Sequence, residues 1–107
     1  MFQKVLVANR GAVAARIMRA LYELGVRSVA VYSEADSRAP WLEMSSEAHP
    51  IGAAPASESY LNQDAILKVL KATGADGLHP GYGFLAENAE FAQRVNDSGA
   101  RFIGPSP

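Results

Sequence analysis

The chain has no cysteine, no long apolar stretch and no marked excess of charge of either sign. Without cysteine, these residues can form no disulfide, thiolate metal site or cysteine nucleophile. No apolar run approaches the roughly 20 residues that a membrane-spanning helix needs, and the first residues do not resemble a targeting leader. Ten basic residues nearly balance eleven acidic ones, which gives no reason to expect nucleic-acid or membrane partners. We therefore expect a soluble, cytoplasmic protein.

The 107 residues include 49% hydrophobic ones, which is enough for one domain with a buried core. Apolar runs at residues 4–8 and 28–32 do not alternate with polar residues, as is typical of parallel strands covered on both faces. Between these runs, apolar residues at helical spacing predict a helix over residues 12–24 that ends at Gly25. The stripe expected to be buried is Val13, Ile17, Leu21 and Leu24.

The remainder of the chain continues this alternation of strands and helices. We predict a short helix at 41–46, a weak strand at 49–52 and strands at 76–79 and 101–104. A helix capped by Asn62 and ended by Gly74 and a further helix over 87–95 complete the pattern; in the former, the expected buried residues are Ile66, Val69 and Leu70. About five strands and at least three helices predict an α/β fold with an open, doubly wound parallel sheet. The Gly-Pro-Ser-Pro ending suggests a domain boundary within a longer protein.

The turn after the first strand contains Asn9 and Gly11. In doubly wound folds this turn can hold a nucleotide phosphate at the helix N-terminus. A dinucleotide fingerprint needs three glycines, however, and this turn has one, so NAD or FAD binding is disfavoured. A tight structural turn and a ligand-binding role for Asn9 and Gly11 remain equally open.

Arg16, Arg19 and Glu23 fall at spacings of three and four on the first predicted helix, away from its apolar stripe. The composition favours a solvated surface with an i, i+4 ion pair worth only about 0.3 kcal/mol. The alternative is a polar contact surface for another subunit.

Residues 79–88, HPGYGFLAEN, follow a predicted strand directly, where open α/β sheets bind ligands. Gly81 and Gly83 would allow a ligand close to the backbone, Tyr82 offers a ring and a hydroxyl, and Glu87 could bind a ligand or complement a helix N-terminus. A binding loop and a structural turn are equally favoured. No metal-ligand spacing involves His49 or His79, so both are interpreted as core or strand-end histidines.

Several blocks together closely resemble the biotin carboxylase family, in its order and spacing: VLVANRG, VAVYSEAD, ESYLN, TGADGLHPGYGFLAEN and FIGPSP. The resemblance runs nearly end to end. It implies that residues 1–107 are the Rossmann-like, pre-ATP-grasp amino-terminal domain of a ligase such as acetyl-CoA, propionyl-CoA, pyruvate or urea carboxylase. Such an enzyme uses ATP, Mg or Mn, and bicarbonate to carboxylate biotin on a carrier protein.

The resemblance also implies roles for individual residues. Tyr82, Gly83 and Glu87 would lie beside the biotin pocket. Residues of the first helix, namely Arg16, Arg19 and Glu23, would contact the other protomer of a homodimer. The ATP-grasp lid and carboxy-terminal domains would follow residue 107 and are absent from this chain, so no catalytic residue, metal ligand or tightly bound cofactor is expected within it. The expected partners are the biotin carboxyl carrier protein or domain and a carboxyltransferase component.

Three positions depart from the family pattern. Ala12 replaces the glutamate of NRGEIA, Ser46 replaces an aspartate, and Ala86 replaces the serine of LSEN. The serine hydroxyl lost at Ala86 would be expected to cap the next helix, worth about 1 kcal/mol. The alternatives are the first domain of another ATP-grasp ligase and a noncatalytic binding or dimerisation module.

Overall fold

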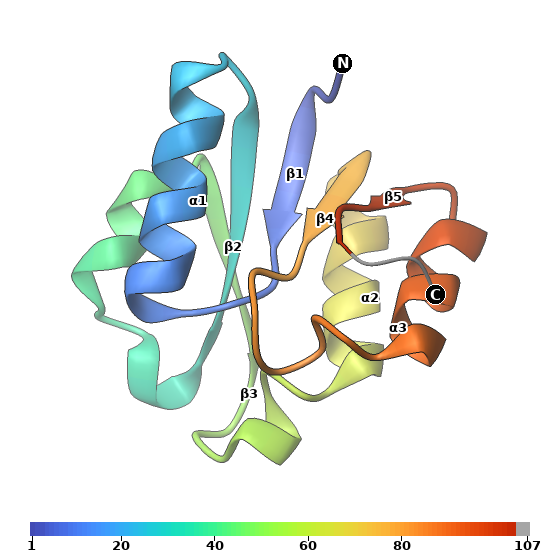
Figure 1. Cartoon of the computed structure of the whole chain (residues 1–107). Coiled ribbons are helices and arrows are strands. Elements are labelled where there is room, and N and C mark those ends of the chain that lie inside the picture. Colours follow the sequence, from blue (N-terminus) through green and yellow to red (C-terminus); the bar gives the residue numbers. More distant parts are fainter. Residues whose placement is uncertain (105–107) are drawn as a thin grey trace.

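The computed structural model describes residues 1–104, which form a five-stranded parallel sheet with helices on both faces (Figure 1). The strands are β1 Lys4–Val7, β2 Arg27–Ser33, β3 Glu47–Gly52, β4 Gly77–His79 and β5 Arg101–Phe102. The helices are α1 Gly11–Glu23, α2 Gln63–Thr73 and α3 Ala89–Asp97. The predicted open, doubly wound α/β sheet is confirmed. None of the helices in this part of the chain has both the length and the apolar character needed to cross a membrane.

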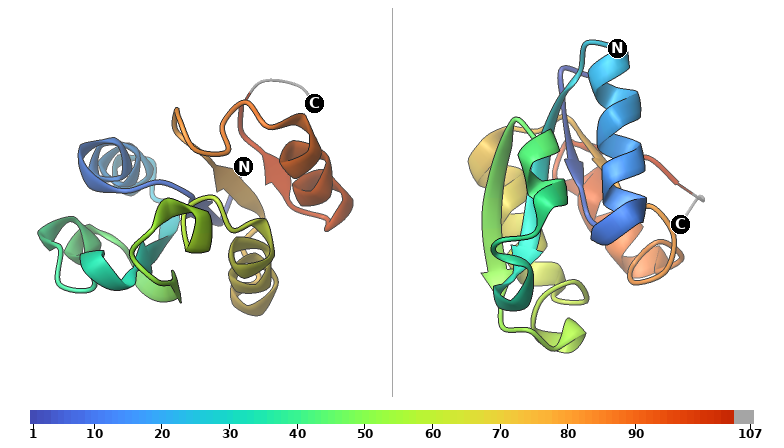
Figure 2. Two further views of the ribbon diagram at one scale, coloured as in Figure 1. Left: turned by 90° about the horizontal axis from the view of Figure 1, so that it is seen from below. Right: turned by 90° about the vertical axis from the view of Figure 1, so that its left-hand side faces the viewer.

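The strand order is β3-β2-β1-β4-β5, so the chain reverses direction across the sheet between β3 and β4. Strands β2 and β3 lie on one side of β1, and β4 pairs with the other edge of β1. Helices α1 and α2 lie on opposite sides of the sheet (Figure 2). The topological switch therefore lies between β1 and β4, and ligands of doubly wound folds bind at the carboxyl ends of the strands there.

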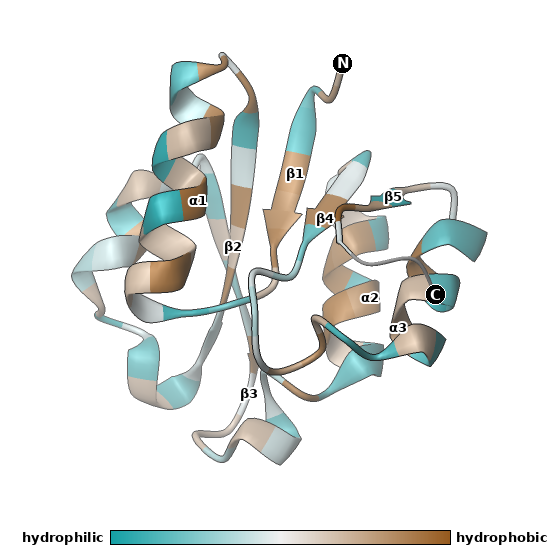
Figure 3. Cartoon of the chain, in the orientation of Figure 1, coloured by the Kyte–Doolittle hydropathy of each residue, from teal (hydrophilic) through white to brown (hydrophobic). Residues whose placement is uncertain are grey.

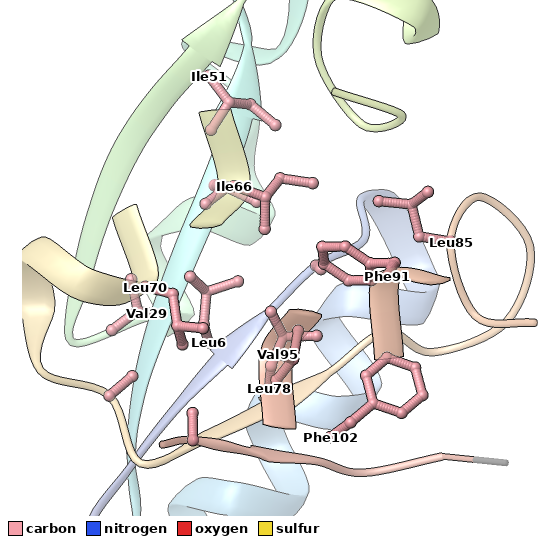
Figure 4. Packing of buried hydrophobic residues seen from close by; sticks show 14 of the residues in the cluster. Leu6, Val29, Ile51, Ile66, Leu70, Leu78, Leu85, Phe91, Val95 and Phe102 are labelled. Carbon is pink, nitrogen blue, oxygen red and sulfur yellow. The ribbon is translucent and has the colours of Figure 1, made fainter. Parts of the chain in front are cut away.

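After Lys4, strand β1 is apolar and fully buried, because both of its faces are covered (Figure 3). Val5 and Val7 pack in the cluster that includes α1, whereas Leu6 packs in the cluster on the opposite face. The larger cluster joins α2 and α3 to the sheet (Figure 4). Within it, Phe91 of α3 meets Phe102 of β5 edge-on, with ring centroids 6.1 Å apart, and this contact helps to hold the two-residue strand β5.

The predicted stripe on the first helix is only partly correct. Leu21 is buried, but Leu24 is 63% exposed because the helix ends at Glu23 and Leu24 is its C-cap. The residues of α1 buried against the sheet also include Ala14 and Met18, whereas the predicted Val13 and Ile17 are half-buried. The stripe is therefore rotated by about one residue, with small Ala14 at the sheet.

Boundaries elsewhere shift by a few residues. The predicted helix at 41–46 is a 3₁₀ turn, Pro40–Met44, and the strand predicted at 49–52 already begins at Glu47. Asn62 caps α2 by accepting a bond from the amide of Ala65, and Gly74 ends that helix with a left-handed φ of 69°. Ile66 and Leu70 are buried as expected, with Val69 half-buried beside them. The predicted boundary at the Gly-Pro-Ser-Pro ending lies largely outside the described residues.

Candidate functional site

Asn9 joins two loops at the carboxyl edge of the sheet, at the topological switch. Its side chain is buried, with 2% of the residue exposed, and its Nδ2 donates to the carbonyl oxygens of Pro80 and Tyr82, both at 2.8 Å. Its Oδ1 accepts from the amide of Arg10 at 2.8 Å. Because both amide hydrogens are used within the protein, the geometry favours the structural interpretation of Asn9 over a ligand-binding one.

The loop after β4 also presses against α1. Gly81 has a φ of +66°, and a Cβ on it would lie 2.7 Å from Cγ1 of Val13 and 2.9 Å from Nδ2 of Asn9. Its amide donates to Nδ1 of His79 at 3.1 Å, and burial lowers the pKa of this histidine. His79 therefore stays neutral at the end of β4, as a strand-end residue whose ring shapes the loop.

A polar cluster lies beside this loop: Asp36 and Tyr60 are buried, and Arg10 covers them from the solvent side. Nε and Nη2 of Arg10 donate to the Asp36 carboxylate at 2.6 and 2.7 Å. The Tyr60 hydroxyl donates to Asp36 at 2.7 Å and accepts from the amide of Ser33 at 3.0 Å. The bonds from Arg10 hold the pKa of Asp36 below its usual range, whereas burial and the bond to Asp36 raise the pKa of Tyr60 to about 12. Asp36 is thus charged and Tyr60 protonated at neutral pH.

This cluster lines an open pocket of about 240 Å³, and Phe84 is part of the same lining. The ring centroids of Phe84 and Tyr60 lie 5.2 Å apart. Phe84 has a φ of 41°, a left-handed conformation that costs a residue with a side chain about 1–2 kcal/mol. Sequence reasoning missed this cluster, although Arg10 and Asp36 each follow a predicted strand and so belong to the same edge of the sheet.

Tyr82 projects from the loop between these anchored residues and is 67% exposed. Gly83 and Glu87 are exposed on the same loop, so the three residues predicted beside a biotin pocket share one accessible segment. Asn9 holds the backbone at Pro80 and Tyr82, whereas the side chains of Tyr82 and Glu87 are open to solvent. The biotin-side role of these residues remains a prediction.

The expectation that position 86 caps the next helix is wrong. Helix α3 begins at Ala89 rather than Glu87, and its N-cap is Asn88, whose side chain accepts from the amide of Phe91 at 2.9 Å. Ala86 is buried, and its amide donates to the carbonyl of Gly83. The chain makes an additional turn before the helix, so a hydroxyl at residue 86 would be too early to cap it.

Arg16, Arg19 and Glu23 are all exposed on α1. Within residues 1–104, no ion pair involves any of them, so the expected i, i+4 pair between Arg19 and Glu23 is absent. Their charged groups are available to a partner.

The other two departures from the family pattern, at Ala12 and Ser46, have local effects. Ala12 leaves the first turn of α1 without an acidic residue, and Oγ of Ser46 accepts a hydrogen bond from the amide of Ser28 at 3.1 Å.

A larger groove, of about 780 Å³, lies between the C-terminal parts of α2 and α3. It borders residues 74–76 before β4 and 98–100 before β5, and so lies at the amino ends of the strands. Doubly wound folds bind ligands at the opposite edge. His49 lies on the edge strand β3, where its Nε2 is 2.9 Å from Oε1 of Glu47. The described residues contain no group of three metal-ligating side chains.

Comparison with known proteins decides the family. The family model for the biotin carboxylase N-terminal domain matches residues 1–107. The chain belongs to this family. Biotin carboxylase 2 of Bacillus subtilis is 53% identical over 107 residues, which are 100% of this chain and 24% of that protein. The biotin carboxylase of Pseudomonas aeruginosa is 52% identical over 106 residues, which are 99% of this chain and 24% of the relative. The chain thus spans about a quarter of the length of these two biotin carboxylases.

Solved structures agree with this biotin carboxylase N-terminal fold. The biotin carboxylase domain dimer of Hydrogenobacter thermophilus 2-oxoglutarate carboxylase, in complex with MgADP, ADP and bicarbonate, matches with a TM-score of 0.94 and 49% identity; the match covers 99% of this chain and 23% of that one. Urea amidolyase of K. lactis matches with a TM-score of 0.96 and 43% identity over 98% of this chain and 6% of its own. The family resemblance of the sequence is confirmed.

Proposed function

We propose that this domain forms the scaffold and the biotin-side wall of a biotin carboxylase. In the complete protein, the enzyme would use ATP and bicarbonate to carboxylate biotin held on a carrier protein, before a carboxyltransferase component uses the carboxyl group. The observation that carries the proposal is the 53% identity to Biotin carboxylase 2 along all 107 residues. The fixed, accessible loop at the switch point supports it.

The domain's own residues supply positioning rather than chemistry. Tyr82, Gly83 and Glu87 would border biotin. ATP and its metal would be held by ATP-grasp domains outside residues 1–107, as the resemblance to the biotin carboxylase family implies. The similar 2-oxoglutarate carboxylase domain binds MgADP and bicarbonate, which supports nucleotide and bicarbonate use by the complete protein. The 107-residue chain alone should be inactive, and micromolar ATP affinity in titration calorimetry would contradict this division of roles.

A chimera tests the function directly. The chain would replace the matching 107 residues of Biotin carboxylase 2, and ADP release would be measured with bicarbonate, with and without free biotin. We expect biotin-dependent ADP release, with the unmodified relative as the reference. A folded chimera without biotin dependence would contradict the proposal and favour another ATP-grasp ligase or a noncatalytic module. Tyr82→Ala in the chimera should raise the KM for biotin while leaving the KM for ATP unchanged.

We also propose that the exposed face of α1, formed by Arg16, Arg19 and Glu23, contacts a second copy of the protein. The lack of partners for these groups within residues 1–104 supports this interface, as does the dimer of the similar 2-oxoglutarate carboxylase domain. Arg19→Glu in the chimera should shift a dimer toward monomer in light scattering. Arg101→Glu, an exposed change of equal charge on β5, is the control. An unchanged assembly in Arg19→Glu would refute the interface.

A further inference from the structure

Asn9, which follows β1, binds the backbone of the loop that carries Tyr82. The two carbonyls that Asn9 binds, those of Pro80 and Tyr82, lie 71 and 73 residues away in the sequence. One planar amide group thus sets the spacing of two loop carbonyls. The Arg10 amide holds Oδ1 of the same group, so the amide cannot rotate without losing three hydrogen bonds.

The far end of the loop is fixed separately. Phe84 packs against the ring of Tyr60, which Asp36 and the amide of Ser33 hold in place. Leu85, the next residue, is buried in the core. Tyr82 and Gly83 are therefore an exposed pair between two anchors, and Asn9 is the anchor that binds the backbone of Tyr82 itself.

We propose that Asn9 is a positioning residue that sets the loop for biotin; this rests on the proposed biotin-side role of Tyr82 and Gly83. The amide suits this task because it offers two hydrogens to two carbonyl oxygens. Alanine leaves both carbonyls without this donor. Aspartate has similar volume but would direct acceptor oxygens at the same carbonyls, so it should disturb the loop at least as much.

The test uses the chimera described above with Asn9→Ala and Asn9→Asp. We expect each variant to lower kcat/KM for free biotin by roughly 10- to 100-fold, since small displacements of positioning groups have effects of this size. The KM for ATP should stay unchanged. The matched control is Asn62→Ala, which removes the N-cap of α2 and so also costs stability, but touches no residue of the 79–88 loop.

A merely structural role would give a different result. It would lower the amount of folded enzyme and leave both constants of the folded fraction unchanged, or change the biotin and ATP constants by the same factor, as in the Asn62→Ala control. Either outcome, or an unchanged biotin constant, would overturn the proposal. The proposal expects a lower kcat/KM for biotin with an unchanged KM for ATP in both Asn9 variants, and no such difference between the two substrates in the control.

A second measurement separates this inference from the proposed function. Hydrogen exchange of peptides covering residues 79–88, followed by mass spectrometry of the chimera, should accelerate in Asn9→Ala and not in Asn62→Ala. If the unsubstituted chimera lacks biotin-dependent ADP release, the function fails, yet this exchange result still decides whether Asn9 positions the loop. Equal exchange in both variants would refute the positioning role.

Discussion

Two glycines of the 79–88 loop offer an internally controlled test of how tightly the loop packs. Gly81 and Gly83 both have left-handed φ angles, +66° and +76°, so alanine costs about 1–2 kcal/mol of conformational strain at either position. At residue 83 a Cβ meets nothing within 4 Å. At residue 81 it meets Cγ1 of Val13 at 2.7 Å and Nδ2 of Asn9 at 2.9 Å, which adds about 1–3 kcal/mol of overpacking.

Gly81→Ala should therefore lower the free energy of unfolding by about 2–5 kcal/mol, and Gly83→Ala by about 1–2 kcal/mol. Urea unfolding of the chain measures both changes, with fluorescence of Trp41, half-buried in the α1 cluster, as the probe. Val13→Ala should reduce the cost of Gly81→Ala in a double-mutant cycle, because it removes the nearest clashing methyl group. Equal destabilisation by the two glycine variants, or strict additivity with Val13→Ala, would refute the packing argument.

Two further predictions concern charge. Ala12→Glu should stabilise the domain by about 0.5 kcal/mol at low salt, since the first turn of α1 has no acidic residue or side-chain cap; denaturation with and without added salt, against Ala12→Gln, measures this gain. Burial lowers the pKa of His79, so its neutral form is favoured in the folded state. The ordinary pKa of histidine, about 6.5, applies to the unfolded chain, and the pKa of His79 in the folded chain is lower. The free energy of unfolding should therefore be at its full value above about pH 6.5 and should decrease as the pH falls from there toward the folded pKa. His79→Asn keeps an acceptor but should lack this loss in parallel urea titrations.

Several elements were predictable because their signals are local. Residues 4–8 and 28–32 are apolar without alternation, and the structure buries both faces of the corresponding strands. Gly74 ends α2 because it adopts a left-handed φ of 69°, and Asn62 caps the same helix. Each of these signals is carried by a few neighbouring residues, so it can be recognised without knowing which segments pack together.

The wrong predictions concern the ends of two helices, which are decided by the direction the chain takes before or after the helix. Leu24 continues a helical spacing but lies after the last helical residue, where it no longer faces the sheet. Similarly, α3 begins after an additional turn, and the cap therefore falls at Asn88 rather than at Ala86. Spacing alone does not reveal where a helix stops or how a preceding turn is wound.

The sequence by itself determined the family, the alternation of strands and helices, and the loop whose residues could face a ligand. Only the tertiary structure brought Asn9 to the carbonyls of residues 80 and 82, and Arg10 to Asp36 and Tyr60. Nothing in local propensity encodes these contacts, because they join residues 24 to 73 positions apart. They form because the strand order places the ends of β1, β2 and β4 side by side, where buried polar groups must find partners.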